Sequence, residues 1–175
     1  MFSNKHADIK IVLLGDCGVG KTNIFTRIFQ NSFSLESKPS KDIQIVTNNI
    51  MIEDRVLKAQ VWDTTGDRRF ASIKKSYMQN AKIVIIICDV TRKSTFNNIE
   101  KWATYVKNYA DPHAKIIVVG NKSDLHNLRE IQSQEAATLT ESKGLPYLEV
   151  SALNSMNIEL LYHSALAEGY LKLLA

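Results

Sequence analysis

A glycine-rich octapeptide at residues 15–22, GDCGVGKT, constrains the fold of this chain more than any other feature. It has the pattern G-x-x-x-x-G-K-[ST], and it lies between an apolar run at 9–14 and a helical pattern at 23–30. Backbone N–H groups of such a loop turn inward around phosphate oxygens, and the start of the helix adds its dipole. The motif predicts a phosphate-binding loop, in which Lys21 reaches the β- and γ-phosphates and the Thr22 hydroxyl binds Mg²⁺. An ordinary glycine-rich turn is the alternative.

Composition limits the class of protein. With 175 residues, 45% of them apolar and 23% charged, we expect one globular domain over 1–175. The net charge of +4 suits a polyanionic ligand or a merely basic surface, and no aromatic-plus-basic cluster indicates a nucleic-acid partner. Two cysteines, Cys17 and Cys88, favour a reduced cytoplasmic chain. No run is long and apolar enough to span a bilayer, and the C-terminus as given carries no cysteine, so we expect peripheral membrane contact only if a lipidated tail is missing from this sequence.

Apolar runs and helical patterns alternate along the chain. Strands are predicted at 9–14, 43–52, 57–62, 82–88, 116–119 and 147–150, and further helices at 94–109, 133–143 and 156–173. The run at 43–52 alternates and contains Asn48-Asn49, which favours an edge strand paired with 57–62 across the turn at 53–55. This order predicts a mostly parallel sheet covered by helices on both faces.

Polar residues follow three of the predicted strands, where ligands bind such sheets. Asp63 can hold Mg²⁺ directly or through water, and the Gly66 N–H can bond a γ-phosphate, although D-x-x-G alone is also a common turn. In N-K-x-D at 121–124, the Asp124 carboxylate can accept two hydrogen bonds that guanine offers and adenine does not. The Lys122 stem can cover the base while its ammonium stays in water, and the Ala152 N–H can contact the guanine carbonyl. A loop capped by Asn and Asp is the alternative.

These elements, in this order, resemble the Ras superfamily of small GTPases, most closely its Rab branch. The segments that carry the resemblance are GDCGVGKT (15–22), WDTTGDRRF (62–70), GNKSD (120–124) and SAL (151–153). It implies a P-loop NTPase three-layer α/β sandwich with a six-stranded, mostly parallel sheet and about five helices. It also implies binding of GTP or GDP with Mg²⁺, GTP hydrolysis and a role in vesicle trafficking.

The resemblance assigns roles residue by residue. It implies catalytic roles for Lys21, Gly66 and Asp67, and Mg²⁺ ligation by Thr22, Ser40 and Asp63. Phe33 would meet the guanine edge-on, or else pack as a loop residue. The implied nucleotide contacts are Cys17, Gly18, Val19, Gly20, Lys21, Thr22, Asn23, Phe33, Ser40, Gly66, Asn121, Lys122, Asp124, Ser151, Ala152 and Leu153.

The chain departs from the family near the γ-phosphate. Ser40 replaces a threonine, Thr65 an alanine, and Asp67 the glutamine that orients the attacking water. An ionised aspartate only accepts hydrogen bonds and is repelled by phosphate, so we expect hydrolysis to be slower by ~10-fold or more. A weak GTPase switch and a non-hydrolysing GTP- or GDP-binding module both remain open. An ATP-specific enzyme is disfavoured by the N-K-x-D motif.

Partner recognition is expected at three positions. Rab proteins present an aromatic trio to effectors, and here these positions are Ile45, Trp62 and Tyr77. With the two switch segments, they are predicted to contact effector, exchange-factor or activating proteins. Packing against the sheet is the alternative for Trp62 and Tyr77.

Overall fold

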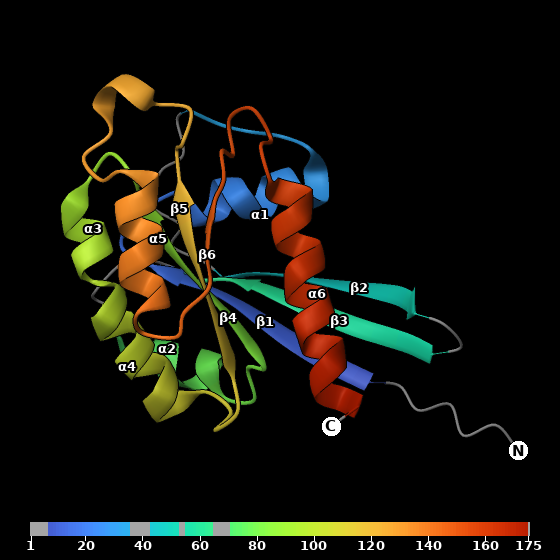
Figure 1. Ribbon diagram of the computed structural model, residues 1–175. Helices are drawn as coiled ribbons and strands as arrows, with labels where there is room; N and C mark the ends of the chain where they lie inside the picture. Colours follow the sequence, from blue (N-terminus) through green and yellow to red (C-terminus); the bar gives the residue numbers. More distant parts are fainter. Residues whose placement is uncertain (1–6, 36–42, 53–54, 65–70, 175) are drawn as a thin grey trace, which may run out of the picture.

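The computed structural model describes residues 7–35, 43–52, 55–64 and 71–174 (Figure 1). The elements follow one another as β1 (Ala7–Gly15), α1 (Lys21–Gln30), β2 (Gln44–Ile52), β3 (Arg55–Asp63), α2 (Ala71–Met78), β4 (Ile83–Asp89), α3 (Lys93–Asn97), α4 (Ile99–Tyr109), β5 (Lys115–Asn121), the 3₁₀ turn η2 (His126–Leu128), α5 (Ser133–Glu141), β6 (Tyr147–Glu149) and α6 (Ile158–Leu174). All six predicted strands are therefore present.

The six strands form one sheet in the order β2-β3-β1-β4-β5-β6. Every neighbouring pair is parallel except β2 and β3, which are antiparallel. The predicted mixed, mostly parallel sheet and the edge position of β2 are confirmed. All seven residues of β4 are buried, because this central strand is covered on both faces, and its continuous apolar run reflects that position.

Alternating side chains of the sheet build two apolar cores. Ile9, Ile11 and Leu13 of β1 pack on the face that α1 and α6 cover. Val12 and Leu14 point to the opposite face, beneath α2, α3, α4 and α5. The result is the predicted three-layer sandwich, with helices on both faces of the sheet (Figure 1).

The helices differ from the prediction in two respects. The single helix expected at 94–109 is two helices, α3 and α4, that meet at Asn98, whose ψ of −5° interrupts the helical hydrogen-bond ladder. Helix α2 was not predicted, because its sequence, ASIKKSYM, has little apolar periodicity. The described part of the chain thus has six α-helices rather than about five. None of the helices described combines the length and the apolar character that crossing a bilayer requires.

Candidate functional site

The loops after β1, β3, β4, β5 and β6 leave the same edge of the sheet, because these strands are parallel. The loops after β5 and β6 are joined directly, since Ser123 N donates to Val150 O at 3.2 Å. Both lie at the top of Figure 1, beyond the carboxyl ends of their strands. The predicted site residues that the structure describes at the ends of these strands therefore share one edge of the molecule.

Glycine is required at two positions of the phosphate loop, residues 15–22. Gly15 has a φ of +149°, and a Cβ there would lie 2.2 Å from the Ile87 carbonyl oxygen. Gly20 has a φ of +95°, and its Cβ would lie 2.3 Å from Asn121 Nδ2. The loop can pack this closely against β4 and the end of β5 only because these two positions carry no side chain. Helix α1 begins at Lys21, directly after Gly20, so its first N–H groups lie at the end of the phosphate loop.

Lys21 lies inside the phosphate loop. Its side chain is only 5% exposed, and Nζ donates to the carbonyl oxygens of Gly15 at 3.2 Å and Asp16 at 2.8 Å. The Asp16 carboxylate, on the outer side of the loop, accepts hydrogen bonds from Asn98 Nδ2 at 2.6 Å and Trp102 Nε1 at 2.9 Å. The start of α4 thereby fixes the loop, a role of Asp16 that was not predicted.

Thr22 and Asp63 form an oxygen pair at the mouth of the loop. Thr22 Oγ1 donates to Asp63 Oδ2 at 2.6 Å. Asp63 is fully buried, and within the described residues its Oδ1 has no hydrogen-bond partner. Burial raises the pKa of Asp63 to about 6, against the lowering effects of the Thr22 hydrogen bond and the Lys21 charge. A buried carboxylate with a free oxygen beside a hydroxyl fits a Mg²⁺ ion, which prefers oxygen ligands.

A cavity of about 260 Å³ opens between the phosphate loop and the loops after β5 and β6. Its polar lining comes from Asn23, Asn121, Lys122 and Asp124, whereas the aromatic ring of Phe33 and the exposed Leu35 border it from the segment after α1. The full lining is Gly18, Gly20, Asn23, Phe33, Ser34, Leu35, Asn121, Lys122, Asp124, Leu125, Ala152 and Leu153. An apolar ring and leucines around a few fixed polar groups suit a planar base.

Hydrogen bonds set the orientation of the polar groups around this cavity. Asn121 Nδ2 donates to Val19 O at 2.8 Å, and Asn121 Oδ1 accepts from Ala152 N at 3.3 Å. Ser151 Oγ donates to Asp124 Oδ1 at 2.5 Å. Asn121 thus ties the phosphate loop to the loop after β6, and Ser151 holds the Asp124 carboxylate at the cavity.

Lys122 has a partner that was not predicted. Its side chain is 34% exposed, and Nζ lies 2.6 Å from Oδ2 of Asp89, a carboxylate that is only 1% exposed. Burial opposes ionisation of Asp89, but hydrogen bonds from Lys122 and Thr91 outweigh it and lower its pKa. The ion pair forms because Asp89 ends β4, next to the strand that leads into Lys122.

Arg27 is a second residue that was not predicted. From helix α1, its Nε donates to the Ala152 carbonyl and its Nη2 to the Leu153 carbonyl, both at 2.9 Å. The guanidinium therefore fixes the backbone of the loop after β6, where Ala152 and Leu153 line the cavity. Nothing in the local sequence marks Arg27, because its partners lie 125 and 126 residues away.

The remaining predicted residues are either buried, exposed or outside the part of the chain that the structure describes. The Val19 side chain is wholly buried in the core, so only its backbone is available to a ligand, whereas Cys17 is exposed on the loop. Ser40, Gly66 and Asp67 lie outside the described residues, as do Thr65 and the turn residues 53–54.

The three predicted partner positions lie together. Ile45 on β2 is paired in register with Trp62 on β3, and the rings of Trp62 and Tyr77 are 6.1 Å apart. Lys10 Nζ lies 3.9 Å from the centre of the Trp62 ring. Ile45 is 48% exposed, so this group presents an apolar side chain to solvent.

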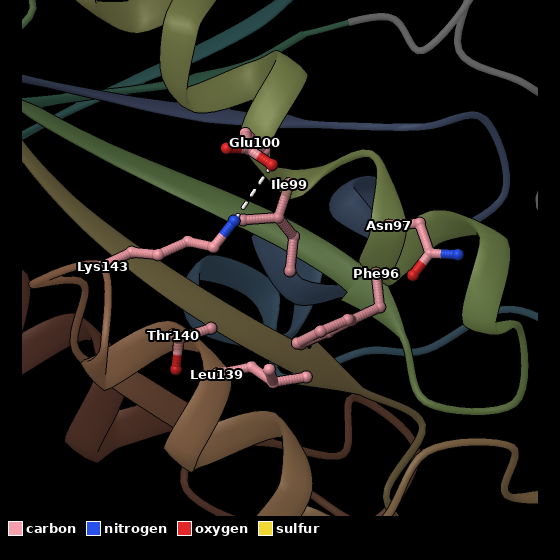
Figure 2. A pocket seen from close by; sticks show the side chains of 7 residues that line it. All are labelled: Phe96, Asn97, Ile99, Glu100, Leu139, Thr140 and Lys143. Carbon is pink, nitrogen blue, oxygen red and sulfur yellow. Dashed lines mark ion pairs between the residues drawn. The ribbon is translucent and has the colours of Figure 1, made fainter.

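A second hollow of about 200 Å³ lies between helices, on the face that α3, α4 and α5 cover. Figure 2 shows the apolar side chains of Phe96, Ile99 and Leu139 facing it, with Lys143 reaching Glu100 at 3.0 Å along one side. None of the predicted site residues lines it.

Comparison with known proteins agrees with the geometry. The Ras family model matches residues 10–170. Ras-related protein RABA2d of Arabidopsis thaliana and Ras-related protein YPTC6 of Chlamydomonas reinhardtii are each 40% identical to this chain over 161 residues, which is 92% of this chain and 74% of either relative. Ras-related protein Rab11C of Lotus japonicus has the same identity and coverage. The chain belongs to the Ras family, as a Rab-like GTP-binding switch.

Proposed function

We propose that this chain, a single domain over 1–175, binds GTP and GDP with Mg²⁺ in the 260 Å³ cavity and hydrolyses GTP slowly. The observation that carries the proposal is that Gly18 and Gly20 of the phosphate loop border the same cavity as Asp124 and Ala152. A ligand with phosphates at one end and a base at the other matches that arrangement.

The proposed contacts follow the distribution of polar groups. Backbone N–H groups from Cys17 to Asn23 bind the phosphates. Asp124 and the Ala152 N–H bind the guanine edge, Asn121 and Ser151 position them, and Lys122, Leu153 and Phe33 cover the ring.

Hydrolysis is proposed as attack of water on the γ-phosphorus, with cleavage of its bond to the β–γ bridging oxygen and release of GDP, phosphate and a proton. Lys21 neutralises charge that develops on the β- and γ-phosphate oxygens, and Gly66 offers its N–H to the γ-phosphate. Mg²⁺, ligated by Thr22, Ser40 and Asp63, supplies further charge neutralisation when bound. Asp67 orients water poorly, which makes the reaction slow.

A non-hydrolysing binding module is the second candidate, and the aspartate at position 67 favours it. Single-turnover hydrolysis by the unchanged chain and by Asp67→Gln separates the two. A weak GTPase should lose GTP slowly, and the variant should react ~10-fold faster or more. No GTP loss from either protein over many hours supports the binding module. If calorimetry with Mg²⁺ detects no heat for GDP or GTP, nucleotide binding itself is refuted.

The cluster of Ile45, Trp62 and Tyr77 is proposed to contact effector, exchange-factor or activating proteins. We place the chain in the cytoplasm, with peripheral membrane contact, in vesicle trafficking, as the Rab resemblance implies. A GTP-dependent partner that still binds Ile45→Asp with unchanged affinity would contradict this assignment of the surface.

A further inference from the structure

The loop after β4 connects the two ends of the candidate nucleotide site, although the sequence motifs do not include it. Asp89, the last residue of β4, is buried, and its two carboxylate oxygens are both engaged. Oδ1 accepts from Thr91 N at 2.9 Å and Thr91 Oγ1 at 2.6 Å. Oδ2 accepts from Lys122 Nζ at 2.6 Å and from Arg92 Nε at 3.1 Å. Two cations from different loops therefore share one oxygen.

Arg92 extends this connection to the phosphate loop. Its Nη2 donates to the Cys17 carbonyl oxygen at 3.2 Å, while Nε of the same guanidinium bonds Asp89. The guanidinium also lies against Gly18, since a Cβ built on that glycine would be 3.6 Å from Nη2. A continuous path of polar contacts thus runs from Cys17 through Arg92 and Asp89 to Lys122.

The backbone holds this path in place. Val90 N donates to Asn121 O at 3.1 Å, and Asp89 N donates to Thr95 Oγ1 at 2.9 Å. Arg92 does not line the 260 Å³ cavity. Arg92 therefore affects a ligand in the cavity through the loops that it joins, and not by direct contact.

We propose that Asp89 and Arg92 are positioning residues that brace the phosphate loop against the base-recognition loop and so slow the release of guanine nucleotide. This inference rests on the nucleotide binding proposed above. A nucleotide held at both ends leaves only when one loop moves away from the other, and the brace opposes that movement. The planar guanidinium is essential because it offers donors in two directions, toward Asp89 and toward Cys17.

The test measures the release of fluorescent GDP by displacement with excess GDP, in Mg²⁺ buffer. Arg92→Ala should release GDP about threefold to tenfold faster than the unchanged chain, and Asp89→Asn faster still, because the buried partner of Lys122 loses its charge. In the Asp89→Asn background, Arg92→Ala should accelerate GDP release by a smaller factor than it does alone, since both changes break the same path of contacts. Lys93→Ala is the matched control, because Lys93 is the neighbouring cation, its side chain is 51% exposed against 42% for Arg92, and it pairs with Glu135.

Two further readouts separate bracing from other roles. Arg92→Lys keeps the charge but offers a single nitrogen in place of the two guanidinium nitrogens that contact Asp89 and Cys17, so it should release GDP nearly as fast as Arg92→Ala; release at the unchanged rate would overturn the brace. The thermal midpoint of the nucleotide-free Arg92→Ala chain should equal that of Lys93→Ala, and a large fall would assign Arg92 to fold stability instead. Equal GDP release from Arg92→Ala and Lys93→Ala refutes this inference alone, whereas failure of the unchanged chain to bind GDP refutes it together with the proposed function.

Discussion

Replacing Asp63 by asparagine removes a charge that burial makes costly in the metal-free chain. The pKa of Asp63 rises from its usual 3.8 to about 6 in the fold, with burial as the main cause. The folded chain therefore binds this proton more tightly than the unfolded chain, and its free energy of unfolding falls as the pH rises through that interval. The full cost, present above about pH 6, is about 3 kcal/mol.

Asp63→Asn should therefore stabilise the chain when nucleotide and Mg²⁺ are absent. At pH 7 the variant should exceed the unchanged chain by up to about 3 kcal/mol in unfolding free energy, and the difference should disappear below about pH 3. Denaturant titrations across this pH range, with a chelator and without nucleotide, measure it. The difference in unfolding free energy between the two chains isolates Asp63, because the other carboxylates contribute equally to both.

When GDP and Mg²⁺ saturate the site, the unchanged chain should instead be more stable than Asp63→Asn, because an amide oxygen is a weaker ligand for Mg²⁺ than a carboxylate. Asp111→Asn is the control of opposite sign. A hydrogen bond from Lys82 lowers the pKa of Asp111, so its stabilisation is present at neutral pH and is lost as the pH falls through the acidic range. If the metal-free Asp63→Asn chain is no more stable than the unchanged chain at pH 7, the buried charge is not costly and the reasoning is refuted.

Three other substitutions probe the cavity. Asp124→Asn should weaken GDP binding by about 30-fold or more in calorimetry, because the guanine edge loses a charged acceptor. Arg27→Ala releases the carbonyl of Ala152, so fluorescent GDP should leave about tenfold faster, and an unchanged rate would show that the loop needs no such support. Gly20→Ala puts a Cβ 2.3 Å from the side-chain nitrogen of Asn121 at the end of β5 and should abolish GDP binding. Gly144→Ala, at a similar positive φ of +69° but with open space around it, should cost about 1 kcal/mol of stability and leave binding intact.

Much of the fold could be predicted from local patterns. The run that became β4 is apolar from Ile83 to Cys88 because that strand is buried on both faces, and the alternation of β2 reflects its place at the edge. The break at Asn98 could not be predicted, because residues on both sides keep a helical pattern while the Asn98 amide bonds Asp16, 82 residues away.

Some residues of the candidate site could be predicted from local sequence, and others could not. The phosphate loop and the N-K-x-D segment are contiguous motifs, so their residues could be named from the sequence. Asp89 and Arg27 could not, because what they do depends on loops brought together by the sheet. Asp89 did carry one signal: it is an acidic residue at the end of a buried strand, as Asp63 is.

The position of Trp102 gives this protein an internal optical probe. The indole N–H bonds the carboxylate of Asp16 in the phosphate loop, whereas the ring of Trp62, the other of the two tryptophans, lies tilted against Tyr77. Indole emission shifts with the polarity of its surroundings and with the loss of a hydrogen bond. In a Trp62→Phe chain, the emission of Trp102 would thus report rearrangement of the phosphate loop without a labelled nucleotide.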